Sequence, residues 1–204
     1  MSNNRSFEER YQENDTPWEL NRPDHNLMDL VTTLSIPAGP AIDLGCGTGD
    51  NSIWLAGQGF TVTGCDLSAL ALDQARAKAD RAKVSCTFVQ GDFMSELPPG
   101  APFSFAFDRG CFHTFDDPTV RNCFVARVAG ILAPHGQWLS IIGNKDEERG
   151  DRPGPPQLSA WEVVAAVEPY FELLSLRRGH FDFNRTPAPL AWICHLGLRD
   201  LCKE

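Results

Sequence analysis

The chain has 204 residues, 42% hydrophobic and 22% charged, proportions typical of one soluble globular domain with a substantial core. Its formal net charge of -9 disfavours non-specific binding to nucleic acid, because there is no excess of Lys and Arg to displace the counterions of a phosphate backbone. No stretch approaches the roughly 20 apolar residues of a membrane span, and the polar N-terminus lacks a signal core, so we expect a cytoplasmic protein that binds no membrane.

The predicted elements alternate between strands and helices along the chain. Apolar periodicity, Gly and Pro punctuation and N-capping serines place them. In chain order we predict a helix over 26–34, a strand over 41–44, a helix over 51–58, a strand over 60–65, a helix from Ser68 to 82, strands over 84–89 and 103–107, a helix over 118–132, a strand over 136–142, a helix from Ser159 to 167, and strands over 171–178 and 190–198.

This alternation predicts a Rossmann-like, doubly wound α/β fold in three layers, with seven mostly parallel strands. No helical pattern separates the last two strands, so we expect them to form an antiparallel hairpin at one sheet edge. The Pro- and Gly-rich segment 149–157 is a loop rather than a linker, because the alternation continues beyond it. We expect a single domain over 1–204, in which the arm and helix over 1–35 form a lid.

Seven cysteines form no C-x-x-C pair, and five histidines are scattered without the spacing of metal ligands. This pattern favours reduced thiols over a disulfide framework or a zinc site. We predict no metal.

A glycine-rich turn follows the strand predicted over 41–44. The segment from Asp43 to Gly49 reads D-L-G-C-G-T-G and leads into a helix, with Gly45, Cys46 and Gly47 at its centre. Glycines let the backbone turn tightly and approach a ligand, while the helix N-terminus offers free N–H donors.

The next predicted strand ends in Asp66. In doubly wound folds a carboxylate at that strand end hydrogen-bonds the hydroxyls of an adenosine ribose. Two adenosine-containing cofactors are then candidates, a dinucleotide and S-adenosylmethionine.

Position 50 separates these two cofactors. The dinucleotide fingerprint G-x-G-x-x-G, begun at Gly45, requires a small residue where the sequence has Asp50, and a carboxylate there would repel a pyrophosphate. The order Asp-x-Gly-x-Gly-x-Gly instead resembles the first motif of class I methyltransferases, which bind S-adenosylmethionine. Asp43 then orients the loop or accepts from the amine of the cofactor's methionine moiety; the simpler alternative is a carboxylate that caps the turn.

A third strand end carries Gln90-Gly91-Asp92-Phe93. The resemblance to class I methyltransferases implies that Asp92 hydrogen-bonds the exocyclic amine of adenine and that Phe93 packs on the ring. Leu67, directly after Asp66, is expected at the same site. Together the three strand ends predict S-adenosylmethionine as cofactor and S-adenosylhomocysteine as product.

Three further motifs narrow the family: Thr16-Pro17-Trp18, Asp108-Arg109-Gly110 and Gly154-Pro155-Pro156. This set resembles the thiopurine S-methyltransferase family and its thiol, halide and tellurite methyltransferase relatives. The resemblance covers nearly the whole chain. It implies that Trp18 covers the methionine end of the cofactor, that Arg109 lies between cofactor and acceptor, and that the acceptor is a small sulfur, selenium or halide nucleophile.

The segment 111–115 follows the fourth strand and is expected to line the acceptor pocket. His113 is a candidate general base, with a hydrogen-bonded structural histidine as the equal alternative. Asp108 could also take the acceptor's proton, and Arg109 would lower the pKa of a bound thiol. Phe112 and Phe115 would make the pocket apolar.

Other functions stay open at this point. The acceptor chemistry could be O- or N-methylation of a small metabolite, or the chain could bind S-adenosylmethionine without catalysis. A nicotinamide-dependent oxidoreductase fits least, because of Asp50. We expect a monomer whose partner is a small-molecule methyl acceptor.

Overall fold

The computed structural model describes residues 6–150, 154–184 and 186–200. Its sheet has seven strands in the order β3-β2-β1-β4-β5-β7-β6. The strands are β1 (Pro40–Leu44), β2 (Thr61–Asp66), β3 (Cys86–Gln90), β4 (Phe103–Arg109), β5 (Leu132–Gly143), β6 (Phe171–His180) and β7 (Leu190–Leu198). Strands β1 to β5 run parallel, and β7 is antiparallel to both β5 and β6. The predicted doubly wound sheet with an antiparallel C-terminal edge is confirmed.

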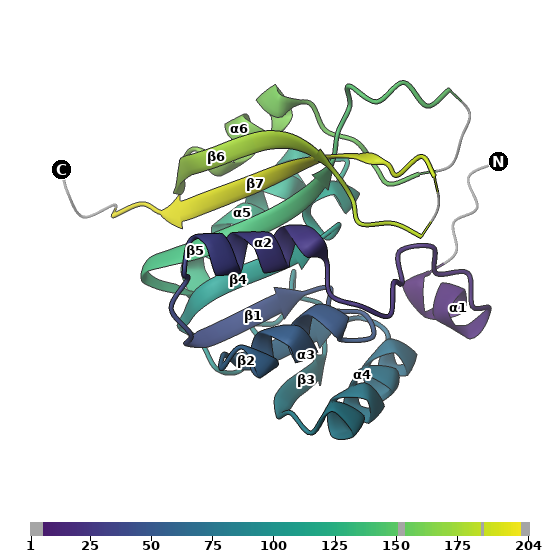
Figure 1. The fold of residues 1–204 in the computed structure, drawn as a ribbon. Coiled ribbons are helices and arrows are strands. Elements are labelled where there is room, and N and C mark those ends of the chain that lie inside the picture. The colour runs from purple at the N-terminus through teal and green to yellow at the C-terminus, as the bar shows by residue number, and fades with distance from the viewer. Residues whose placement is uncertain (1–5, 151–153, 185, 201–204) are drawn as a thin grey trace.

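Helices cover both faces of this sheet (Figure 1). The covering helices are α2 (His25–Thr33), α3 (Asp50–Gly57), α4 (Ala69–Ala82), α5 (Pro118–Ile131) and α6 (Ala160–Val167). Helix α1 (Phe7–Gln12) lies beside α4 instead, and a 3-10 turn spans Phe112–Thr114. Apolar side chains of α2 and α3 share one core with the sheet, and those of α5 and α6 share a second core with its other face. The result is the expected three-layer arrangement.

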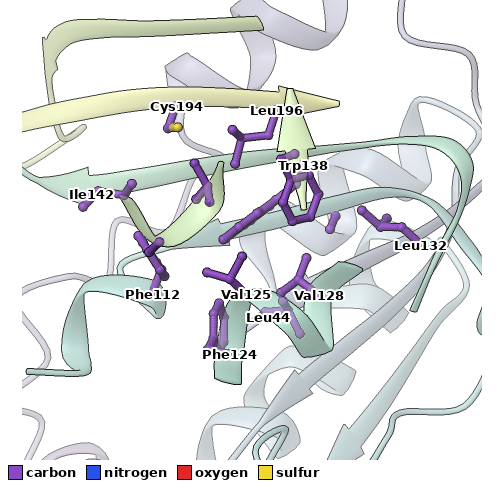
Figure 2. Packing of buried hydrophobic residues seen from close by; sticks show 14 of the residues in the cluster. Leu44, Phe112, Phe124, Val125, Val128, Leu132, Trp138, Ile142, Cys194 and Leu196 are labelled. Atoms are coloured by element: carbon purple, nitrogen blue, oxygen red, sulfur yellow. The ribbon is translucent and has the colours of Figure 1, made fainter. Parts of the chain in front are cut away.

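The core between the sheet and α5 is rich in aromatic rings. Figure 2 shows Phe124 and Val128 of α5 in one cluster with Trp138 and Ile142 of β5. Phe112 packs edge-on against Trp138, with ring centroids 5.5 Å apart. Because this core lies directly beneath the end of β4, it fixes the position of that strand end.

Local signals set most of the helix boundaries. The Ser68 hydroxyl accepts from the N–H of Ala71 and begins α4, and Ser159 forms a capping box with Glu162 at the start of α6. Helix α1 was not predicted, although Ser6 and Glu9 form a capping box there, because Tyr11 is its one buried residue and the apolar stripe is missing. None of the helices in the described ranges is both long and apolar enough to cross a membrane.

Candidate cofactor and acceptor site

The glycine-rich turn between β1 and α3 is joined to the end of β2. Gly45, Gly47 and Gly49 all have positive φ, between 53° and 82°, which glycine adopts without strain. The N–H groups of Gly45 and Cys46 donate to the Cys65 carbonyl at 2.8 and 3.1 Å. The turn after β1 is therefore held against the end of β2.

Asp66 completes this connection with its carboxylate. One oxygen accepts from the N–H of Gly47 at 2.8 Å, and the other accepts from the N–H of Ser68 at 2.9 Å. Burial raises the pKa of Asp66, and these backbone donors oppose the rise. On the other side, the Gly91 N–H donates to the Asp66 carbonyl at 3.1 Å, which brings the end of β3 to the same edge.

The Asp43 side chain is buried between the glycine-rich turn and α3. It is 1% exposed, and the Ser52 hydroxyl of α3 donates to it at 2.7 Å. Burial raises the pKa of Asp43 to about 7, and the Ser52 hydrogen bond opposes this rise. These contacts favour the loop-orienting role over direct contact with a ligand amine.

At the end of β3, Asp92 and Phe93 lie in different environments. Asp92 is exposed, and its carboxylate accepts from the Met94 N–H at 2.8 Å. The ring of Phe93 is buried in the core, 5.4 Å from the ring of Phe124, so it offers little surface to adenine. Leu67, by contrast, is 53% exposed next to Asp66 and presents an apolar surface at this edge.

The N-terminal arm lies over the glycine loop. The Trp18 indole N–H donates to the Tyr11 hydroxyl at 3.0 Å, which in turn donates to Glu19 at 2.8 Å. A Cβ placed on Gly47 would lie 2.8 Å from the Tyr11 oxygen and 2.9 Å from Glu19. The sequence analysis assigned Tyr11 and Glu19 no role, since no local pattern indicates that they reach Gly47, which lies 36 residues after Tyr11 and 28 after Glu19.

Charged groups fasten this closed arrangement. The Thr48 hydroxyl donates to Glu19, and Lys78 of α4 donates to Thr48 at 2.6 Å. Lys78 also forms an ion pair with Asp50 at 2.9 Å, both side chains being 17% exposed. Asp50, which argued against a dinucleotide, thus belongs to the bracing of the loop.

Arg109, at the end of β4, connects segments far apart in the sequence. Its Nε donates to the buried Asp24 carboxylate at 2.8 Å, and its two terminal nitrogens donate to the carbonyls of Trp18 at 3.0 Å and Asp182 at 2.6 Å. Every guanidinium nitrogen is therefore engaged. The contacts show Arg109 fastening the arm to the strand end.

Asp108 is fully buried beside it. The carboxylate accepts from the N–H groups of Cys111 and Phe112 and from the Trp138 indole, at 3.0 to 3.1 Å. Burial raises the pKa of Asp108 to about 6, although these donors oppose the rise. The Asp108 carboxylate is 0% exposed, so it holds the turn after β4 in place and has no surface at which to take a proton from an acceptor. Phe112 is likewise buried in the core, so it does not line a pocket.

His113 is 4% exposed, and its Nδ1 accepts from the Gly143 N–H at 2.6 Å. Burial, with the charges of Arg109 and Arg149, lowers the pKa of His113 to about 3. The imidazole is therefore neutral with its proton on Nε2, and these contacts favour the hydrogen-bonded structural histidine over the general base, the two alternatives for His113. Next to it, the Cys111 side chain lies 3.4 Å from the Cβ position of Gly45, so the turn after β4 adjoins the glycine loop.

The sequence is similar to a family model and to known methyltransferases. The family model described as "Methyltransferase domain" matches residues 41–136. The probable thiol methyltransferase 2 of Arabidopsis thaliana is 32% identical over 181 residues, covering 86% of this chain and 78% of the relative. Thiocyanate methyltransferase 1 of Brassica oleracea is 28% identical, covering 78% of this chain and 70% of the relative.

A solved structure shares the fold. The 1,6-didemethyltoxoflavin-N1-methyltransferase of Burkholderia thailandensis, with bound 1,6-didemethyltoxoflavin and S-adenosylhomocysteine, superposes with a TM-score of 0.72. The two chains are 22% identical, over 94% of this chain and 85% of that one.

Proposed function

Because the chain belongs to the class I S-adenosylmethionine-dependent methyltransferases, we propose that it transfers the methyl group to a small thiol or a related soft nucleophile. Membership of the family makes it an enzyme with S-adenosylmethionine as cofactor. The observation that carries the choice of acceptor is that both candidate proton acceptors at the end of β4 are otherwise occupied: Asp108 by buried donors, and His113 as a neutral donor itself.

An acceptor that ionises easily suits such a site. A thiol has a reference pKa of about 8.5, so a useful fraction is thiolate near neutral pH without help from a base. The likeness to a probable thiol methyltransferase and to a thiocyanate methyltransferase supports the same class of nucleophile.

The residues at the strand ends fit the cofactor. Gly47 has no side chain where Tyr11 and Glu19 of the arm approach the turn, and Gly49 precedes α3 with no side-chain cap over the N–H groups of that helix. We assign the binding of the ribose hydroxyls to Asp66 and that of the adenine to Leu67 and Asp92. The backbone of Gly45, Cys46 and Gly47 would bind the methionine end of the cofactor, and Trp18 would cover that end. Asp43 contributes by holding the loop through Ser52.

When bound, S-adenosylmethionine supplies a methyl group already activated on a sulfonium, so the protein's task is alignment and exclusion of water. Alignment of two reactants can lower the activation free energy by on the order of 7–11 kcal/mol in favourable cases. Cys111, against Gly45, sets the distance between the cofactor loop and the acceptor side. Arg109 holds Trp18 and Asp24 of the arm in place and so keeps the site closed.

The arm over 1–35 acts as the lid of a single methyltransferase domain. Tyr11 and Glu19 lie directly over Gly47, so the arm must lift for the cofactor to exchange. Residues 1–5 of this expected lid, and 151–153 of the predicted loop 149–157, lie outside the described residues.

An acceptor screen with isotopically labelled S-adenosylmethionine tests the proposal. The panel contains sulfide, alkyl thiols, aryl thiols, thiocyanate and iodide, together with phenols and amines of matched size. We expect label in the sulfur compounds first. Transfer to phenols or amines at rates above those of every sulfur compound would overturn the assignment and identify an O- or N-methyltransferase.

A further inference from the structure

Glu19 of the N-terminal arm places a carboxylate at the glycine turn, and the cofactor assignment above gives it no part. Its Oε1 lies 2.9 Å from the position that a Cβ on Gly47 would occupy. The N–H of the same glycine donates to the Asp66 carboxylate at 2.8 Å. Burial raises the pKa of Asp66, and the nearby charge of Glu19 adds to the rise. Two carboxylates therefore approach one residue of the turn, one from the arm and one from the end of β2.

Glu19 forms no ion pair within the described parts of the chain. Its two oxygens accept instead from the hydroxyls of Tyr11 and Thr48, which are neutral donors. The lysine of this network, Lys78, donates to Thr48 rather than to Glu19, and it is already paired with Asp50 at 2.9 Å. A carboxylate has about four lone-pair sites, so each oxygen of Glu19 can accept a further hydrogen bond without losing its hydroxyl donor.

The arm carries Glu19 over the part of the site that we assign to the methionine end of the cofactor. Trp18, directly before Glu19, is held at the end of β4, where Arg109 donates to its carbonyl at 3.0 Å. The arm thus spans from the end of β4 to Gly47 within two residues. S-adenosylmethionine has two cationic groups, a sulfonium without hydrogen-bond donors and an α-ammonium with N–H donors. A carboxylate that accepts from hydroxyl groups matches the ammonium.

We propose that Glu19 binds the α-ammonium of S-adenosylmethionine. A Glu19 oxygen accepts from the ammonium while it keeps its contact with Tyr11 or Thr48. Because these hydroxyl contacts also hold the arm over Gly47, Glu19 couples closure of the arm to the presence of the amino-acid end of the cofactor. The inference deepens the proposed function and rests on it for the placement of the methionine end, but it is independent of the methyl acceptor.

Three ligands separate recognition of the ammonium from a merely structural role of Glu19. S-adenosylhomocysteine carries the α-ammonium, its desamino analogue lacks only that group, and methylthioadenosine lacks the whole amino-acid end. The variant Glu19→Gln removes the charge but keeps an amide oxygen that can accept from a hydroxyl of the arm network. Glu13→Gln is the matched control, because Glu13 is an exposed carboxylate at the end of α1 in the same arm.

Titration calorimetry measures the affinity of each variant for each ligand. We expect Glu19→Gln to bind S-adenosylhomocysteine roughly 10- to 100-fold more weakly than wild type, the range for a lost hydrogen bond to a charged group. Its affinities for the desamino analogue and for methylthioadenosine should stay near those of wild type, and Glu13→Gln should match wild type with all three ligands. Equal losses for S-adenosylhomocysteine and its desamino analogue would overturn the proposal, because they would give Glu19 a structural role alone. Undiminished binding of S-adenosylhomocysteine by Glu19→Gln would overturn it as well.

A second measurement uses the wild-type protein alone. In crystals grown with S-adenosylhomocysteine, the ammonium nitrogen should lie about 3 Å from a carboxylate oxygen of Glu19. An ammonium directed away from Glu19 would overturn the inference and leave the proposed acceptor untouched. A wild type that methylates no thiol but shows the ligand pattern above would sink the proposed acceptor and support the role of Glu19.

Discussion

Removing the guanidinium of Arg109 should loosen the arm and destabilise the whole domain. In Arg109→Ala, Asp24 would lose its ionic partner while its side chain stays 0% exposed, and the carbonyls of Trp18 and Asp182 would lose their donor. Breaking a buried ion pair on one side costs about 3–5 kcal/mol. For a chain of this length each kcal/mol lowers Tm by roughly 2–4 °C, so we expect a fall of about 6–20 °C.

Urea denaturation measures the free energy of unfolding directly, and limited trypsin digestion reports on release of the arm. Arg22→Ala is the matched control, because Arg22 pairs with Asp182 with its side chain 45% exposed, and an exposed pair contributes about 1 kcal/mol or less. Arg109→Ala should be clearly less stable than this control and cut faster within the arm. If Arg109→Ala unfolded within about 1 kcal/mol of wild type with the arm still protected, the reasoning that Arg109 anchors the arm would be refuted.

Three further substitutions test the cofactor edge. Gly47→Ala places a side chain on a backbone with φ of 53°, with its Cβ 2.8 Å from the Tyr11 oxygen. Titration calorimetry should show the affinity for S-adenosylmethionine reduced by about tenfold or more. An unchanged affinity would contradict the close approach of the arm to Gly47. Asp66→Asn should weaken binding by roughly 10- to 100-fold through the lost charged hydrogen bonds, with the fold retained in circular dichroism; wild-type affinity would remove Asp66 from the ribose site. Asp43→Asn tests the pH dependence of stability. Because the pKa of Asp43 is raised to about 7 in the folded protein, the wild type loses stability as the pH rises from about 4 to 7, and urea titrations should show the variant gaining stability relative to wild type over that range. A stability difference that does not change with pH would count against a buried neutral Asp43.

Much of the fold could be predicted because its signals are local. Ser68 and Ser159 cap the helices that they were expected to cap, and the short apolar runs between helices became the parallel strands. Strand β5 begins at Leu132 rather than at the predicted 136, because Pro134 and Gly136 look like a turn. In the structure this stretch belongs to β5, which carries extra residues there, because Phe103 of β4 pairs with Leu132 and Phe105 pairs with Gln137.

The position of the cofactor edge could be predicted for a similar reason. Parallel strands end at the same side of the sheet, so Gly45, Asp66 and Asp92 had to lie near one another once the strand order was known. The ring of Phe93 lies in the core rather than at the expected adenine site, because packing on Phe124 buries apolar surface that would otherwise face water.

The roles at the end of β4 depended on distant partners. Arg109 contacts Asp24, 85 residues earlier, and Asp182, 73 residues later. The protonation of His113 is decided by the backbone of Gly143, 30 residues away. No pattern within a short window carries such information, so the sequence could name these residues as candidates but could not separate a base from a donor.

A crystal structure with bound S-adenosylhomocysteine would show whether the three strand ends bind one nucleoside. We expect the ribose hydroxyls within hydrogen-bond distance of Asp66, the adenine beside Leu67 and Asp92, and the thioether sulfur directed toward Cys111 and His113. A nucleoside bound away from the tips of β1, β2 and β3, or one whose sulfur faces away from the end of β4, would contradict this expectation.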